Sequence, residues 1–126
     1  MLRKFNPPGM GSSNMYHQGV EITSFKRMLF ISGQVGVGSD GAPGKDIRQQ
    51  TELAINNLYN ILAAADMDAN DIVKTTIYLT DENLLGAFME AGASSLPSAP
   101  PATTLVIVKA LASPDLLIEI EAVAAK

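Results

Sequence analysis

The order of strand-like and helix-like periodicities along the chain is the feature that most constrains its fold. After a leading loop over residues 6–14, apolar residues recur first at strand spacing and then at helical spacing, and this change repeats before two final strands. The first two strands should form a hairpin across the four residues 24–27. The predicted strands cover Tyr16–Thr23, Met28–Val35, Ile72–Thr80, about Thr103–Leu111 and about Leu116–Ala124.

Two helices are predicted between these strands. Asp46 is the expected N-cap of the first helix, with Gln49 three residues later. The second helix runs from Glu82 to about Ser95, where a proline-rich segment stops it. This order predicts an α+β fold with two helices packed on one face of a mixed β-sheet, in a single domain spanning residues 1–126. The apolar face of the first helix is expected to comprise Ala54, Leu58, Ile61, Leu62 and Ala65.

The strand expected from Thr103 onward has apolar side chains on both of its faces. Leu105 and Ile107 point to one side, whereas Val106 and Val108 point to the other. Two helices on one face of the sheet cover only one of these sides. The other side would be costly in water, at about 25 cal/mol per Å² of apolar surface. We therefore expect another copy of the chain to cover it, in an obligate oligomer whose symmetry the periodicity does not give.

The composition argues against several kinds of site. The chain has 126 residues, of which 47% are apolar, and this suits one compact core. It contains no cysteine and a single histidine, His17. We therefore expect no disulfide, no thiolate or multi-histidine metal site and no cofactor. His17 has no neighbouring carboxylate in the sequence, so it is expected to be a surface or interface residue.

Charge and hydropathy patterning narrow the expected partners and location. The chain has 13 acidic and 9 basic residues and no tryptophan, so no nucleic-acid partner is expected. Basic residues near the N-terminus are not followed by an apolar stretch, and no later segment approaches a membrane-spanning length. These patterns predict a soluble cytoplasmic protein without a membrane partner.

Three strings occur in order along the chain: Leu29–Val35 (LFISGQV), Asp71–Asp81 (DIVKTTIYLTD) and Ile118–Ala122 (IEIEA). Found together at this spacing, they resemble the Rid (YjgF-type) family of small trimeric enamine/imine deaminases. The resemblance runs from about Tyr16 to Ala124. It implies a homotrimer with ligand clefts between subunits, in a fold like that of the trimeric chorismate mutases.

The resemblance also implies roles for individual residues. Tyr16, in the string Tyr-His-Gln-Gly, matches the family's cleft tyrosine, and Ser32 and Gly33 match the residues that line the cleft. Glu119 matches the glutamate that positions or activates the attacking water, which makes it the expected catalytic residue. Leu105 stands where many members have a cysteine.

Residues 101–104 read Pro-Ala-Thr-Thr, where a typical member has Pro-Ala-Arg-Ser. Thr103 therefore stands in place of the arginine that holds the substrate carboxylate. An arginine pairs with a carboxylate bidentately and stays charged. A single hydroxyl should forfeit about 1.5–3 kcal/mol or more of that interaction. Either another cation enters the cleft, with Arg27 and Lys109 as candidates, or the ligand is neutral, or the site is not catalytic.

Without the resemblance, the same residues have simpler interpretations. Glu119 and Glu121 alternate with apolar residues, which is typical of the solvated face of an edge strand. Ser32 and Gly33 would mark a strand end entering a turn, and Tyr16 would be a half-buried aromatic.

Three functions remain compatible with the sequence. The first is a deaminase-like hydrolase in which Glu119 handles water. The second is a non-catalytic trimer that binds a small metabolite in the same cleft. The third is an endoribonuclease or translation inhibitor, which the acidic balance and the few aromatic residues disfavour.

Overall fold

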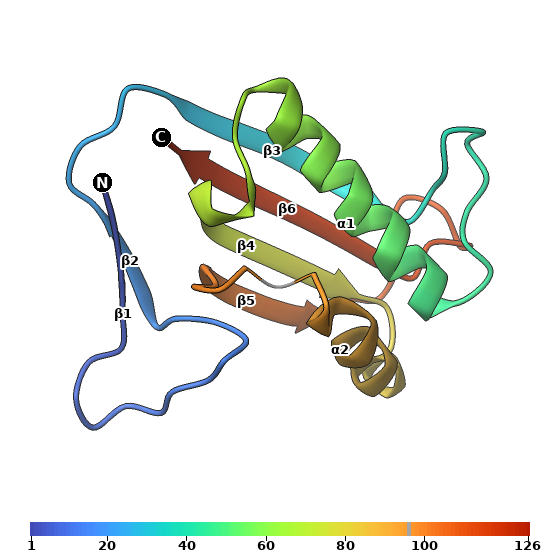
Figure 1. The fold of residues 1–126 in the computed structure, drawn as a ribbon. Coiled ribbons are helices and arrows are strands. Elements are labelled where there is room, and N and C mark those ends of the chain that lie inside the picture. The colour runs from blue at the N-terminus through green and yellow to red at the C-terminus, as the bar shows by residue number, and fades with distance from the viewer. Residues whose placement is uncertain (96) are drawn as a thin grey trace.

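The computed structural model describes residues 1–95 and 97–126 and contains a four-stranded sheet, a separate two-stranded ribbon and two α-helices (Figure 1). Two short 3-10 helices, Ala69–Asp71 and Glu82–Leu84, precede β4 and α2. None of the helices in the described part of the chain is long and apolar enough to cross a membrane. The main elements are β1 (Leu2–Phe5), β2 (Gly19–Ile22), β3 (Met28–Val35), α1 (Ile47–Ala64), β4 (Ile72–Leu79), α2 (Leu85–Ala93), β5 (Ala102–Ile107) and β6 (Ile118–Ala125).

The four-stranded sheet has the order β3-β6-β4-β5. The β4 and β5 strands run parallel, and the other neighbouring pairs run antiparallel, so the sheet is mixed. Both helices lie on the same side of this sheet (Figure 1). The predicted α+β fold, with two helices on one face of a mixed sheet, is confirmed.

The α1 helix begins and ends as its sequence suggests. The Asp46 side chain caps it by accepting a hydrogen bond from the Gln49 N–H at 2.9 Å. At its C-terminal end, Asp66 adopts a left-handed conformation with φ of 55°, and the Met67 N–H donates to the Leu62 carbonyl at 2.9 Å. Of the predicted apolar face, Ala54, Leu58 and Leu62 are fully buried, while Ile61 and Ala65 pack at the edge of the core.

The core lies between α1 and the sheet. Alternate residues of β6 face the helices and are buried, namely Ile118, Ile120, Ala122 and Ala124. Their neighbours in the sheet, which include Ile31 of β3 and Leu79 of β4, lie on the same side. The small side chains of Ala122 and Ala124 leave room for the helix to approach the sheet.

The predicted hairpin between residues 16–23 and 28–35 is wrong. The β2 strand pairs antiparallel with β1, a strand that the sequence analysis did not predict, whereas β3 pairs with β6. The N–H groups of Lys26 and Arg27 both donate to the Lys126 carbonyl, at 2.9 and 3.0 Å, and this directs β3 to the end of the chain. Local apolar runs signal a turn between strands, but they carry no information about a distant partner.

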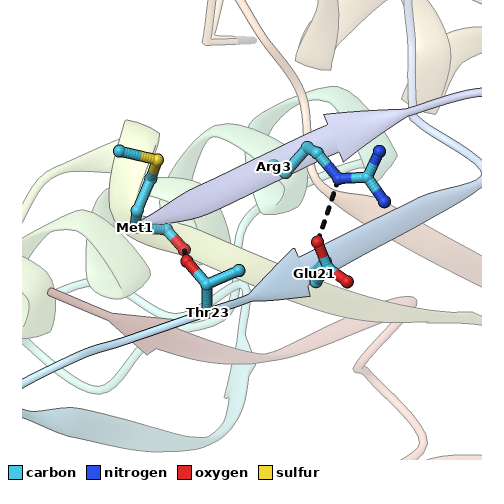
Figure 2. A network of polar contacts seen from close by, with 4 residues as sticks. All are labelled: Met1, Arg3, Glu21 and Thr23. Carbon is cyan, nitrogen blue, oxygen red and sulfur yellow. Dashed lines mark hydrogen bonds and ion pairs between the residues drawn. The ribbon is translucent and has the colours of Figure 1, made fainter.

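Side-chain contacts add to the antiparallel backbone pairing of the β1–β2 ribbon. Figure 2 shows Arg3 of β1 reaching across to Glu21 of β2, with 3.0 Å between Nε and Oε1. At the end of the ribbon, the N–H and hydroxyl of Thr23 donate to the Met1 carbonyl. The Phe5 ring packs over Gly19, where a Cβ would lie 3.0 Å from the ring.

Strand and helix ends differ from the expected bounds by a few residues. The β5 strand stops at Ile107 rather than near residue 111, and β6 starts two residues later than predicted. The expected helix from Glu82 begins as a 3-10 turn and becomes α-helical at Leu85. These shifts leave the order of the elements unchanged.

The sheet face turned away from the helices, called here the open face, carries exposed apolar residues. Phe30 of β3 is 73% exposed, and Val106 of β5 is 39% exposed. In the registers of the sheet, Phe30 lies opposite Val123 and Val106 opposite Tyr78, so all four side chains share this face. Leu105 lies opposite Ile77 and faces the helices.

Candidate functional site

A pocket of about 470 Å³ lies on the helix-covered side of the sheet. Its floor is formed by residues of β4 and β5, and α1 and α2 supply further walls. Three of the residues singled out in the sequence, Tyr16, Thr103 and Leu105, line it. The apolar walls include Ile55, Leu58, Ile77, Phe88, Met89 and Ile120.

Two threonine hydroxyls form a polar point in this pocket. The Thr103 Oγ1 of β5 lies 2.8 Å from the Thr75 Oγ1 of β4, and it is 3.4 Å from the Pro101 carbonyl. Thr75 is 9% exposed. Sequence reasoning missed Thr75, because a threonine in mid-strand gives no signal of its partner until the neighbouring strand is known.

The loop that carries Tyr16 is anchored to the segment preceding β5. The His17 Nδ1 lies 2.6 Å from the Pro100 carbonyl, and the His17 N–H donates to the Pro101 carbonyl at 3.0 Å. These two contacts hold Met15 and Tyr16 against the pocket. The half-buried His17 therefore has a positioning role, more specific than the surface or interface position expected from the sequence.

Ser32, Gly33 and Glu119 form a second cluster, on the open face. A β-bulge between Ile31 and Gln34 inserts one extra residue of β3 opposite β6. The Glu119 carboxylate of β6 packs so closely on Gly33 that a Cβ at position 33 would collide with it. A glycine is required here because the side chain of another strand occupies the space. Within the described residues, no hydrogen bond to the Glu119 carboxylate is formed.

The two clusters lie on opposite faces of the sheet. Thr103 is in register with Thr75, on the helix side, whereas Glu119 is in register with Tyr78, on the open face. One chain therefore does not present Thr103 and Glu119 to the same small molecule. A site that uses both must combine the pocket of one chain with the open face of another.

The open face carries polar groups that the sequence analysis did not single out. The Tyr78 hydroxyl donates to the Glu121 carboxylate, and this hydrogen bond raises the pKa of Tyr78 above its usual value. Lys74 donates to the Thr104 hydroxyl at 2.6 Å. The alternation of Lys74, Thr76 and Tyr78 along their strand is the signal that places these side chains on one face.

Within one chain, neither cation proposed to replace the missing arginine lines the pocket. Arg27 donates to the Ala65 carbonyl at 2.6 Å, beside the C-terminal end of α1. Lys109 lies two residues beyond the end of β5 and is not among the residues that line the pocket. Among the described residues that line the pocket, none is charged. In residues 1–95 and 97–126, no cluster of three acidic or histidine side chains could hold a metal ion.

Comparison with known sequences gives consistent matches along the chain. The family described as Endoribonuclease L-PSP matches residues 9–126. A RutC family protein of Pyrococcus horikoshii is 37% identical over 115 residues, covering 88% of this chain and 86% of that protein. The 2-iminobutanoate/2-iminopropanoate deaminase of Salmonella typhimurium is 36% identical over 115 residues, covering 88% of this chain and 87% of the deaminase.

Solved structures match the fold over nearly the whole chain. YyfB of Yersinia pestis, a conserved Rid family protein of unknown function, has a TM-score of 0.88 and 33% identity, covering 99% of this chain and 98% of that one. Escherichia coli TdcF with bound serine has a TM-score of 0.74 and 32% identity, covering 92% of this chain and 91% of that one.

Proposed function

The chain belongs to the Rid family, and from this premise we propose that it is a homotrimer that binds a small molecule between subunits and hydrolyses an enamine or imine there. Relatives of similar sequence include 2-iminobutanoate/2-iminopropanoate deaminases. In this proposal Glu119 is the catalytic residue. The ligand contacts are Tyr16, Thr103 and Leu105 of one subunit and Ser32 and Gly33 of its neighbour.

The observation that carries this proposal is the environment of Glu119. Its carboxylate lies against the bulge at Gly33, half-buried, and has no hydrogen-bond partner among the described residues. A carboxylate free of internal partners can accept a proton from a water molecule. The exposed Ser32, next to Gly33 in the chain, can offer its hydroxyl to a ligand.

The proposed reaction has two proton transfers through Glu119. A water oxygen attacks the imine carbon while Glu119 takes one water proton and passes it to the imine nitrogen. The resulting carbinolamine then loses its hydroxyl proton through Glu119 to the same nitrogen. The C–N bond breaks, ammonia leaves, and a carbonyl compound remains, with Glu119 again ionised.

Thr103 supports a second candidate, a trimer that binds a metabolite without turnover. A hydroxyl does not replace the charge-assisted grip of an arginine on a carboxylate. If binding geometry depends on that grip, the water and the reacting carbon would not be held within reach.

An RNA-cleaving activity is less well supported. Nucleic-acid binding depends on lysine and arginine side chains that neutralise phosphates. The open face instead presents Glu119 and Glu121, with Lys74 committed to Thr104. The chain as a whole carries a net charge of -4.

The proposal is tested by comparing the imine hydrolysis rates of the unmodified protein, Glu119→Gln and Glu121→Gln. Imines would be generated in solution by an amine oxidase, which gives uncharged imines, or by an amino-acid dehydratase, which gives carboxylated ones. We expect the unmodified protein to accelerate carbonyl release from at least one kind. Glu119→Gln keeps the shape but removes the base, so it should lower the rate by about a hundredfold or more.

Glu121→Gln is the matched control, because Glu121 lies two residues along the same strand on the same face. Its rate should stay close to that of the unmodified protein. Equal loss in both variants would favour a solvated pair of carboxylates without a catalytic role. If the unmodified protein accelerates the hydrolysis of neither kind of imine, the non-catalytic binder is the function that remains.

A further inference from the structure

The pocket lined by Thr75, Thr103 and Leu105 has a polarity that defines a class of ligand. We propose that it takes an uncharged, mainly apolar molecule with one carbonyl-like or imine-like group, and that it rejects carboxylates. The inference rests on the proposed function because it concerns the same site. It names the substrate class that a turnover experiment alone leaves open.

The lining of the pocket argues against a bound anion. Its described walls are apolar side chains apart from a few hydroxyl groups, and none of them is charged. A carboxylate that enters such a pocket loses its hydration without gaining a counter-ion. An apolar ligand gains from the same walls, because its own surface leaves water.

Three cations elsewhere in the chain are bonded to other partners. Lys4 donates to the carbonyls of Asn70 and Ala99, and burial lowers its pKa. Arg48 pairs with Glu90 at 3.2 Å. Lys74 lies on the open face, bonded to the Thr104 hydroxyl. None of these three cations is among the residues that line the pocket.

The threonine pair matches a neutral polar group. Each hydroxyl has one proton and two lone pairs. If Thr103 donates to Thr75, the Thr75 proton is free for a ligand; if Thr75 donates to Thr103, the Thr103 proton is free or turns to the Pro101 carbonyl. Unless the Thr103 proton turns to the Pro101 carbonyl, the pair can donate a hydrogen bond to a carbonyl oxygen or imine nitrogen, and in each arrangement it can also accept one. It has no fixed charge with which to hold a carboxylate.

The size of the pocket suits a small molecule. Its volume of about 470 Å³ lies within the range of roughly 300–1,000 Å³ that is usual for small-molecule sites. The loop at Tyr16, which His17 anchors, closes one side of it. The described lining of this pocket therefore comes from a single chain.

Acetophenone and benzoate test this inference as a matched pair. They have nearly the same shape, but one is a neutral ketone and the other a carboxylate. Isothermal titration of the unmodified protein should give a dissociation constant for acetophenone at least about tenfold lower than for benzoate. Equal or tighter binding of benzoate, or no saturable binding of acetophenone, would overturn the proposal.

Two threonine variants locate the binding. Thr103→Val keeps the shape and removes the hydroxyl, so acetophenone should bind about three- to tenfold more weakly. Thr104→Val, on the opposite face of the same strand, should leave its affinity unchanged. Equal effects of the two variants would place the probe outside the pocket and overturn the inference. A fall in oligomer mass on adding acetophenone would also overturn the inference. It would mean that a second copy of the chain normally fills the pocket.

The outcome separates this inference from the proposed function. Selective acetophenone binding without imine turnover would support the proposed ligand class and contradict the proposed enzymatic activity. Faster turnover of carboxylated than of uncharged imines would keep the enzyme and overturn the ligand class.

Discussion

At residue 103 a hydroxyl lies in a mainly apolar pocket. The Thr103 side chain is half-buried and is already paired with Thr75 at 2.8 Å, so it completes a neutral surface. A charged residue at this position would be partly removed from water. It would have no counter-ion in the pocket unless a ligand supplied the opposite charge. The identity of residue 103 should therefore determine whether the pocket accepts anions.

Thr103→Arg should reverse the charge preference of the pocket. A guanidinium can pair bidentately with a carboxylate, so benzoate should bind about ten- to a hundredfold more tightly than to the unmodified protein. Isothermal titration measures this change, and Thr104→Arg, on the open face, is the control. Unchanged benzoate affinity in Thr103→Arg would show that residue 103 does not contact the ligand.

The sequence predicted some of the site residues more completely than others. It singled out Glu119, Ser32 and Gly33, and the structure brings these three together across the β3 bulge. Their roles stay predictions. The hydroxyl partner Thr75 was not predicted, because the pairing of β4 with β5 is a tertiary contact that local sequence patterns do not predict.

At the scale of elements, periodic segments were predictable and their partners were not. The apolar face of α1 and the alternation in β6 identify a helix and a strand from local spacing alone. The pairing of β3 with β6 joins distant parts of the chain, so the expected local hairpin was wrong. The β1 strand was missed because four residues are too few to show a clear period.

A buried polar residue in α1 likewise could not be predicted from local spacing. Gln50 is 1% exposed and joins α1 to the segment before β6: its Nε2 donates to the Gly44 and Asp115 carbonyls, and its Oε1 accepts from the Leu117 N–H at 2.8 Å. A hydropathy pattern treats Gln50 as a surface residue. Its buried position is explained by the backbone groups of the loops with which it forms hydrogen bonds.

Gln50→Leu should destabilise the chain by about 2–4 kcal/mol, because it leaves buried backbone groups without partners. Urea unfolding followed by circular dichroism gives this difference. Asn60→Leu, on the exposed side of the same helix, is the control and should change the free energy of unfolding by about 0.5 kcal/mol or less. Equal stability of the two variants would mean that water satisfies the groups that Gln50 now bonds.

At the scale of the whole molecule, the open face is the feature that a single chain leaves uncovered. Phe30 is 73% exposed there, beside the half-buried Val123. We expect copies of the chain to bury this face in a homotrimer. Light scattering on a gel-filtration peak should then give about three times the chain mass of 13.3 kDa.

Phe30→Asp should shift the protein toward smaller species, because it places a charge in the expected interface. Asn60→Asp, on the exposed side of α1, is the matched control and should leave the mass unchanged. A well-folded monomer of the unmodified chain at micromolar concentration would contradict the trimer and the cleft between subunits.

Mixed oligomers test whether two chains build each site. Thr103→Trp should fill the pocket and Glu119→Gln should remove the base, so each variant alone should be inactive toward imines. Co-expressed with different tags and purified through both tags, they should regain about a third of the unmodified rate, since a trimer that contains both variants pairs an intact pocket with an intact Glu119 at about one site in three. Two differently tagged copies of Glu119→Gln, treated in the same way, should remain inactive. If mixed oligomers form without regaining activity, one chain must supply both groups, which the opposite orientations of Thr103 and Glu119 on the sheet would not allow without rearrangement.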